Sequence, residues 1–169
     1  AASPNGDGGN NMRRSGEIDR LLNEMAVYKT ELARGSVTGQ FRRIQATIQN
    51  IPDVNISNSE GYTYLMIAVM QHKADVVKLL LEAGADPNIG RRDGVRPLAA
   101  VFLKRTEQRQ EIVRLLVDHG ADPSLGDRPG QTAFDFAEIT QAEPHLIELL
   151  EEANLRLHGV PRGSGQANA

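Results

Sequence analysis

Residues 76–88 read VVKLLLEAGADPN, and residues 112–124 read IVRLLVDHGADPS. The second stretch begins 36 residues after the first (112 − 76). Similarity at a period of a few tens of residues is typical of stacked repeats, which bury their apolar faces only against neighbours. Stacked repeats present a long surface rather than one enclosed pocket, so the repetition favours a binding role over catalysis.

Turn residues and apolar runs divide this part of the chain into short helices. After the turn NSEGYT at 58–63, the apolar run YLMIAVM at 64–70 predicts one helix, and residues 74–83 predict a second that Gly84 ends. Gly61 lies where the turn requires positive φ. It recurs as Gly94 after 33 residues (94 − 61) and as Gly130 after 36 (130 − 94). The three additional residues fall in the polar stretch 105–110.

The chain ahead of the repeats predicts a long helix over 17–33, with Ser15 as its N-cap and one apolar stripe. A further helix over 40–50 follows it. The second helices of the repeats predict a core of paired leucines. These are Leu79, Leu80, Leu115, Leu116, Leu149 and Leu150.

The composition limits the chemistry of the chain. Its 169 residues include no Cys, which excludes disulfides, zinc–thiolate sites and cysteine nucleophiles. The net charge of −3 is too small to indicate a nucleic-acid or membrane partner. No apolar run approaches the roughly 18 residues that span a bilayer. Cytoplasmic and exported locations both remain open.

No catalytic, metal or cofactor motif stands out. The four histidines are not at metal-ligand spacing, and no Gly-x-Ser-x-Gly stretch is present. His119 precedes the helix end at Gly120, where a cation suits the helix dipole. Asp86 and Asp122 are explained as turn formers. We therefore expect no enzyme activity, no cofactor and no metal.

Three stretches of the chain resemble ankyrin repeats. They are GYTYLMIA at 61–68 with VVKLLLEAGADPN at 76–88, GVRPLAAV at 94–101 with IVRLLVDHGAD at 112–122, and DRPGQTAFDFA at 127–137. The resemblance covers roughly residues 36–153. It implies an all-α fold, an α-solenoid of stacked antiparallel helix pairs joined by β-hairpin-like turns.

The resemblance also predicts how the chain is divided. The predicted segments are a disordered tail over 1–14, a helical N-terminal cap over 15–57, a repeat over 58–90, a repeat with the insertion over 91–126, a C-terminal capping repeat over 127–157 and a disordered tail over 158–169. A docking helix for another subunit is the alternative for 17–33.

The middle repeat departs furthest from the family pattern. The family's Thr-Pro-Leu-His element has lost its His in all three repeats, and Arg96 replaces the Thr as well. We therefore expect residues 91–126 to form the weakest cooperative unit of the array.

The resemblance implies that another protein contacts the turn tips and the concave face of the first helices. The matching tip positions are Ser59, Glu60, Tyr62, Arg92, Asp93, Val95, Arg128 and Gln131. The matching first-helix positions are Met70, Gln71, Leu103, Lys104, Ile139 and Thr140. An exposed Tyr beside a Met is a frequent hot-spot composition. Alternatively, Met70 and Leu103 reach into the stack.

A basic strip crosses the middle repeat and indicates a partner with acidic or phosphorylated groups. We define this strip as Arg91, Arg92, Arg96, Lys104, Arg105 and Arg128. Ordinary solvated charge is the alternative, because Asp93 and Glu107 interrupt it.

Two functions follow from these observations. The first is a non-catalytic protein–protein interaction module, monomeric on its own. The second is a targeting domain or subunit of a larger secreted effector or toxin-immunity system whose chemistry lies elsewhere. The start at Ala1 rather than Met fits an excised or exported chain. Arg outnumbers Lys by 15 to 4, which indicates a GC-rich, bacterial source.

Overall fold

The computed structural model describes residues 16, 20 and 38–163. The predicted tail over 1–14 and the predicted helix over 17–33, apart from Arg20, lie outside the described residues, as does the end of the chain from 164. The described elements are α2 (Thr38–Gln49), α3 (Tyr64–Met70), α4 (Ala74–Glu82), α5 (Pro97–Ala100), the 3-10 helix η1 (Val101–Leu103), α6 (Arg109–Asp118), α7 (Ala133–Ile139) and α8 (Pro144–His158).

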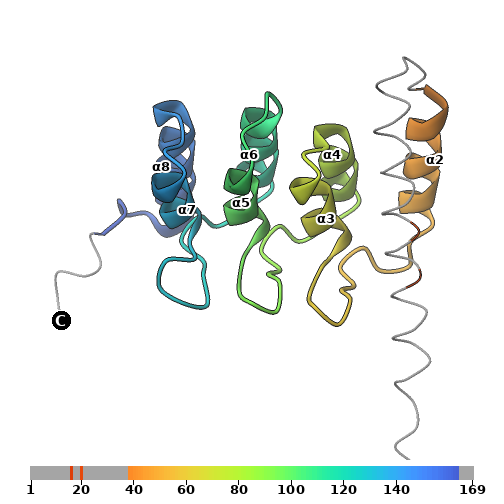
Figure 1. The fold of residues 1–169 in the computed structure, drawn as a ribbon, viewed down its shortest axis with the longest axis horizontal. Coiled ribbons are helices and arrows are strands. Elements are labelled where there is room, and N and C mark those ends of the chain that lie inside the picture. Colours follow the sequence, from red (N-terminus) through yellow and green to blue (C-terminus); the bar gives the residue numbers. More distant parts are fainter. Residues whose placement is uncertain (1–15, 17–19, 21–37, 164–169) are drawn as a thin grey trace, which may run out of the picture.

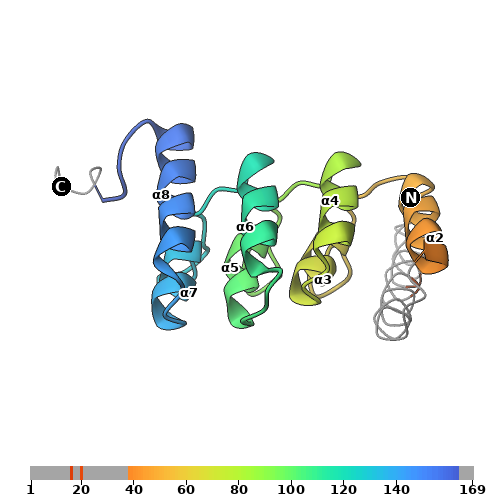
Figure 2. The same ribbon diagram turned by 90° about the horizontal axis from the view of Figure 1, so that it is seen from above.

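The helices stack as successive antiparallel pairs (Figure 1). Helices α3 and α4 form one pair, α5 with η1 and α6 the next, and α7 and α8 the last. Seen from above, α4, α6 and α8 form one row and α3, α5 and α7 the other (Figure 2). The loops between pairs all extend to the same side (Figure 1). The predicted all-α fold is confirmed, since the described residues form no strand and only one isolated bridge, Ser57 to Thr63.

The core runs continuously from α2 to α8 between these rows. Leu80, Leu116 and Leu150 are fully buried in it. The predicted burial of their neighbours Leu79, Leu115 and Leu149 is only partial. Adjacent helical residues point about 100° apart, so one leucine of each pair faces the core and the other lies at its edge.

Glycine is required at the hairpin tips because the loops of neighbouring repeats touch there. Gly61 has φ +85°, and a Cβ on it would lie 2.5 Å from the amide nitrogen of Arg92. That amide donates to the carbonyl of Glu60 at 2.9 Å, which joins the first tip to the second. The prediction of positive φ at Gly61 is confirmed, and Gly94 repeats it with φ +92°.

The first helices differ in how they begin. Thr63 caps α3 by accepting from the amide of Met66 at 3.1 Å. Thr132 caps α7 in a capping box with Asp135. Arg96, in the equivalent position, makes no side-chain capping bond to α5, which lasts four residues before the 3-10 turn η1. The middle first helix is therefore the least regular one.

Asparagines connect the repeats. Asn88 donates from Nδ2 to the carbonyl of Gly120 at 3.0 Å, and its Oδ1 accepts from the amide of Asp122 at 2.8 Å. Asn55 makes the same two bonds to the loop that follows it, with Gly84 and Asp86. We refer to these two residues as the asparagine ladder. Asn88 therefore reaches the next repeat rather than bonding across its own hairpin, because the corresponding loops of adjacent repeats lie side by side.

Candidate partner-binding surface

A hollow of about 260 Å³ opens beside the first hairpin tip. Its lining residues are Asn58, Glu60, Tyr62, Ile67, Met70 and Gln71. Four of them, Glu60, Tyr62, Met70 and Gln71, are among the predicted partner contacts. The loop contributes the polar rim and Tyr62, whereas α3 contributes Ile67 and Met70. We call this hollow the Tyr62 pocket.

The loop wall of the pocket is fixed by a side chain. Asn58 accepts at Oδ1 from the amides of Glu60 and Tyr62, each at 3.0 Å. An Asn side chain that accepts from backbone amides of its own loop stabilises the turn in the way that a backbone carbonyl would. The loop that carries Tyr62 is therefore held in one conformation.

Arg91 of the next repeat braces the pocket from the side. Its guanidinium lies 5.5 Å from the centre of the Tyr62 ring, and its Nη1 points at the Met70 sulfur, 4.0 Å away. Asp93 holds the same guanidinium in an ion pair and accepts from its Nε at 3.1 Å. The bond from Arg91 keeps the pKa of Asp93 below its ordinary value. The sequence prediction placed Arg91 in the basic strip and missed this role.

The basic strip is partly neutralised within the array. Besides the Arg91 pair, Arg96 bonds Asp127 at 2.8 Å, and Arg105 lies 3.6 Å from Glu143. The remaining three members are Arg92, Lys104 and Arg128. They are exposed, and they form no ion pair with any carboxylate in the described part of the chain.

The other predicted tip residues divide between surface and interior. Ser59, Arg92 and Asp93 lie exposed on adjacent tips, and the Ser59 carbonyl accepts from Arg92 Nη1 at 3.5 Å. Val95 is not on the surface, since it is 6% exposed and belongs to the core. Gln131 is half-buried and donates to the carbonyl of Asp93 at 2.8 Å, so its amide connects the second tip to the third.

The ends of the first helices carry aliphatic side chains into solvent. Leu103 is 52% exposed and Ile139 is 74% exposed. Lys104, the residue after Leu103, is also exposed. Thr140 is half-buried and donates its hydroxyl to the carbonyl of Phe136 at 2.7 Å. Of the two alternatives for Leu103, exposure holds, whereas Met70 is half-buried and lines the Tyr62 pocket.

The insertion is built into the stack. Arg109 is 3% exposed, its guanidinium lies 4.9 Å from the centre of the Phe102 ring, and its Nη2 donates to Thr140 Oγ1 at 3.2 Å. Its Nη1 lies 3.6 Å from Glu143, and burial lowers its pKa. A polar stretch of sequence gave no indication that one of its arginines is buried.

The insertion also contacts the repeat before it. Thr106 Oγ1 lies 2.7 Å from Nδ1 of His72, and Gln108 Oε1 accepts from the amide of Ala74 at 3.0 Å. Burial lowers the pKa of His72, and the charges of Lys104 and Arg109 add to this effect. The insertion therefore joins the first repeat to the third across the middle one.

A serine, a histidine and an aspartate meet at the end of the array but do not form a catalytic triad. His158 Nε2 lies 3.0 Å from Asp122 Oδ2 and 3.3 Å from Ser124 Oγ. The Ser124 hydroxyl donates to Asp122 Oδ1 at 2.7 Å. A triad needs the two ring nitrogens to face different partners, whereas here one nitrogen faces both. The cluster anchors α8 to the preceding loop.

The structure also places His119, Asp86 and Asp122, whose roles were predicted from the sequence. His119 faces the carbonyl of Leu115 through Nδ1 at 2.8 Å, at the C-terminal end of α6. Asp86 accepts from the amide of Asn88 at 2.8 Å, and Asp122 accepts from that of Ser124 at 2.9 Å. Both aspartates form turns, as predicted.

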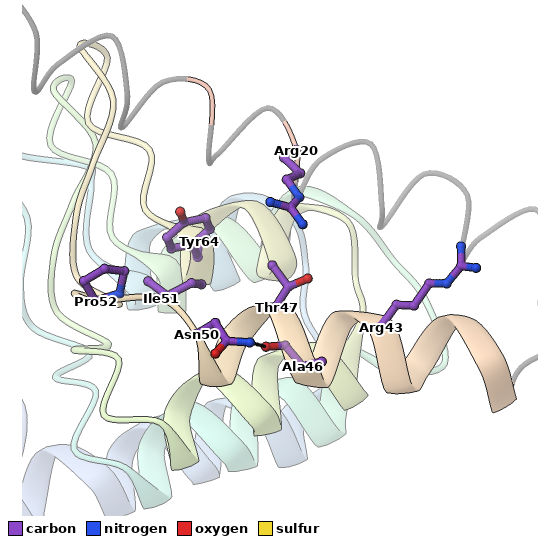
Figure 3. A pocket seen from close by; sticks show the side chains of 8 residues that line it. All are labelled: Arg20, Arg43, Ala46, Thr47, Asn50, Ile51, Pro52 and Tyr64. Carbon is purple, nitrogen blue, oxygen red and sulfur yellow. Dashed lines mark hydrogen bonds between the residues drawn. The ribbon is translucent and has the colours of Figure 1, made fainter.

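A second hollow lies at the N-terminal end of the array (Figure 3). It measures about 370 Å³ and is lined by Arg20, Arg43, Ala46, Thr47, Asn50, Ile51, Pro52 and Tyr64. Figure 3 shows Arg20 across the hollow from α2, and Asn50 bonded to the carbonyl of Ala46 at 2.8 Å. None of its lining residues is a predicted partner contact.

The described residues offer little else for chemistry. Among them, no three His, Asp or Glu side chains gather in a way that could hold a metal ion. No helix in this part of the chain combines the length and the apolar character needed to cross a membrane.

Comparison with known proteins places the repeats in a family. The family model for ankyrin repeats (many copies) matches residues 48–98. The chain is 40% identical over 90 residues to mouse ankyrin repeat and MYND domain-containing protein 1, an alignment that covers 53% of this chain and 9% of that protein. It is 34% identical over 149 residues to mouse BCL-6 corepressor-like protein 1, covering 88% of this chain and 8% of the relative. The chain thus spans less than a tenth of the length of these relatives.

A solved structure shares the fold. An ankyrin repeat domain from Acinetobacter baumannii superimposes with a TM-score of 0.58, covering 69% of this chain and 65% of that one at 24% sequence identity. Ankyrin repeats generally serve as non-catalytic scaffolds for protein–protein interaction. The repeated sequence, the stacked helix pairs and these matches agree, and they identify the described array as ankyrin repeats.

Proposed function

We propose that this chain is a non-catalytic module that, as a monomer, binds another protein through its hairpin tips and the face formed by its first helices. The Tyr62 pocket carries the proposal. It combines an aromatic ring with an adaptable thioether at a hollow on the surface, a frequent composition of binding hot spots. Arg91 and Asn58 already hold these groups in place. Little conformational entropy is therefore lost when a partner binds.

The charge left on this face favours a partner with acidic groups. Arg92, Lys104 and Arg128 are the exposed cations of the basic strip that make no ion pair with a described carboxylate. Guanidinium groups in this state are available for carboxylates or phosphates of a partner. The predicted contacts at Val95 and Gln131 are left out, because one is core and the other bonds the array.

A partner captured from the source organism and identified by mass spectrometry would allow a direct test. Replacing Arg92 and Arg128 together by Glu should weaken its binding by about tenfold or more and reduce the dependence of the association rate on salt. Arg114→Glu with Arg156→Glu, on α6 and α8, is the matched control, because it makes the same charge change on helices outside this face. Unchanged affinity and unchanged salt dependence in the double variant would exclude an acidic partner at the tips.

The same module would serve as the targeting part of a larger secreted effector or toxin-immunity system, with the chemistry elsewhere. The curated relatives support a modular role, since the matching segment makes up 9% and 8% of their lengths. The coding sequence on both sides of this chain distinguishes the two functions. A neighbouring catalytic domain or export signal would favour the targeting role, and their absence would favour an independent module.

A further inference from the structure

Three aliphatic side chains occupy the same position in successive repeats. Met70, Leu103 and Ile139 are each the last residue of the first helix of their repeat. Leu103 and Ile139 are 52% and 74% exposed, and Met70 lines the Tyr62 pocket. We call these three residues the aliphatic row. A single exposed aliphatic side chain is common on protein surfaces and needs no explanation. Three of them at the same position of successive repeats form a line across the array.

The spacing of the row matches a repeat distance of an α-helix. Helix α5 packs against both α3 and α7, and packed helices lie roughly 8–10 Å apart. Residues seven positions apart in an α-helix are about 10.5 Å apart and point in nearly the same direction. A partner helix that lies along the aliphatic row could therefore place every seventh side chain against one residue of the row.

The polar groups of this face favour a helix over an extended peptide. An extended chain needs hydrogen-bond partners for its own backbone, whereas a helix satisfies its backbone internally. Two side-chain donors that could bond such a backbone are already engaged. The Gln131 amide bonds the Asp93 carbonyl, and the Thr140 hydroxyl bonds the Phe136 carbonyl.

The charges on this face indicate which polar residues the partner helix carries beside its apolar side chains. Lys104 follows Leu103 directly, and Arg92 and Arg128 occupy neighbouring tips. These three cations outnumber Glu60 and Glu107, two exposed carboxylates that form no ion pair with a described residue. Acidic residues beside the heptad positions would complement them.

We infer that the partner presents an acidic amphipathic helix, whose apolar side chains at heptad spacing pack on the aliphatic row. This inference rests on the proposed function, because it names the kind of partner that the same face takes. The helix runs across the repeats, parallel to the stack, with one end at the Tyr62 pocket.

Two synthetic peptides of identical composition test the spacing. Each has three heptads, about 21 residues rich in Glu and Ala, with three leucines. In the first peptide the leucines are seven residues apart, and in the second they are five apart, which spreads them around the helix. We expect fluorescence anisotropy to show binding of the first peptide at least tenfold tighter than of the second. Equal binding, or no binding of the first, would overturn the inference.

Variants of the row show where the peptide binds. Leu103→Asp with Ile139→Asp should weaken the first peptide by about tenfold or more, because both side chains would be buried on binding. Leu155→Asp with Leu157→Asp on α8 is the matched control, since these leucines are 50% and 46% exposed and α8 lies in the other row of helices. Circular dichroism of each variant verifies the fold. An equal loss in the control would also contradict the inference.

The natural partner separates this inference from the proposed function. If the captured partner binds the row variant as tightly as the unchanged chain but loses affinity with the tip variant, the helix inference fails and the proposed function stands. If the chain captures no partner protein, the proposed function fails.

Discussion

At the scale of single residues, Arg109 shows how a charge can be placed inside a small repeat protein. Its guanidinium stacks on Phe102, bonds Thr140 and faces Glu143. A buried charge without such partners would destabilise the fold by several kcal/mol. Because these partners come from two repeats, the residue joins the middle repeat to the last one.

Replacing Arg109 by Met should lower the free energy of unfolding by about 1.5–3 kcal/mol, the usual size of lost bonds to a charged group. Urea unfolding followed by circular dichroism measures this. The control is Arg114→Met on the same helix, which is exposed and should change stability by less than about 0.5 kcal/mol. Equal effects of the two variants would show that the contacts of Arg109 contribute nothing.

At the scale of single helices, the starts of α3, α5 and α7 separate strong from weak units. In the capping box of α7, the Asp135 carboxylate accepts from the Thr132 amide at 3.0 Å and from its hydroxyl at 2.7 Å. These bonds from Thr132 lower the pKa of Asp135. The carboxylate is therefore more easily ionised in the folded chain than in the unfolded one.

This difference makes the stability depend on pH with a definite sign. The unfolded state binds more protons between the two pKa values, so the contribution of Asp135 is complete above about pH 4 and is lost as pH falls through the lowered pKa. Asp135→Asn should flatten that loss in urea unfolding measured from about pH 5 to pH 2. Asp118→Asn, an exposed residue at the end of α6, is the control. A wild-type loss that Asp135→Asn leaves unchanged argues against the capping box as its source.

At the scale of the whole molecule, stability is distributed along a line of units. Each repeat contacts its neighbours. The free energy of unfolding is approximately the sum of the intrinsic stability of each repeat and the stability of each interface between neighbours. The middle repeat lacks a capping side chain at Arg96, and its first helix changes to a 3-10 turn after four residues. The contacts of the insertion offset part of this weakness.

Native-state hydrogen exchange should find the amides of residues 91–110 less protected than those of the equivalent segments 58–72 and 127–140, because no side chain caps α5. Arg96→Thr should raise their protection by restoring the cap found at Thr63 and Thr132. A map in which 91–110 is the best protected segment would refute the prediction.

The features that repeat in the sequence could be predicted, and those that occur once could not. Gly61 and Leu80 recur at equivalent positions and Thr63 recurs at Thr132, so their roles follow from the period and from local geometry. Val95 matches a tip position by the same alignment, yet the loop turns its side chain into the core. The brace of Arg91 and the burial of Arg109 depend on side chains from other repeats, which no local pattern contains.

The asparagine ladder bears on how long such an array can be. Asn55 and Asn88 offer the following loop the same two groups, and each loop presents the same carbonyl and amide in return. A duplicated unit inserted between them would meet matching connections on both sides, so the ladder permits growth by gene duplication. The ladder ends at Ser124, which stands where the next asparagine would be and contacts His158 of α8 instead of another loop. Among the described repeats, the joint between units is thus repeated, whereas the closing contact of Ser124 with His158 occurs once.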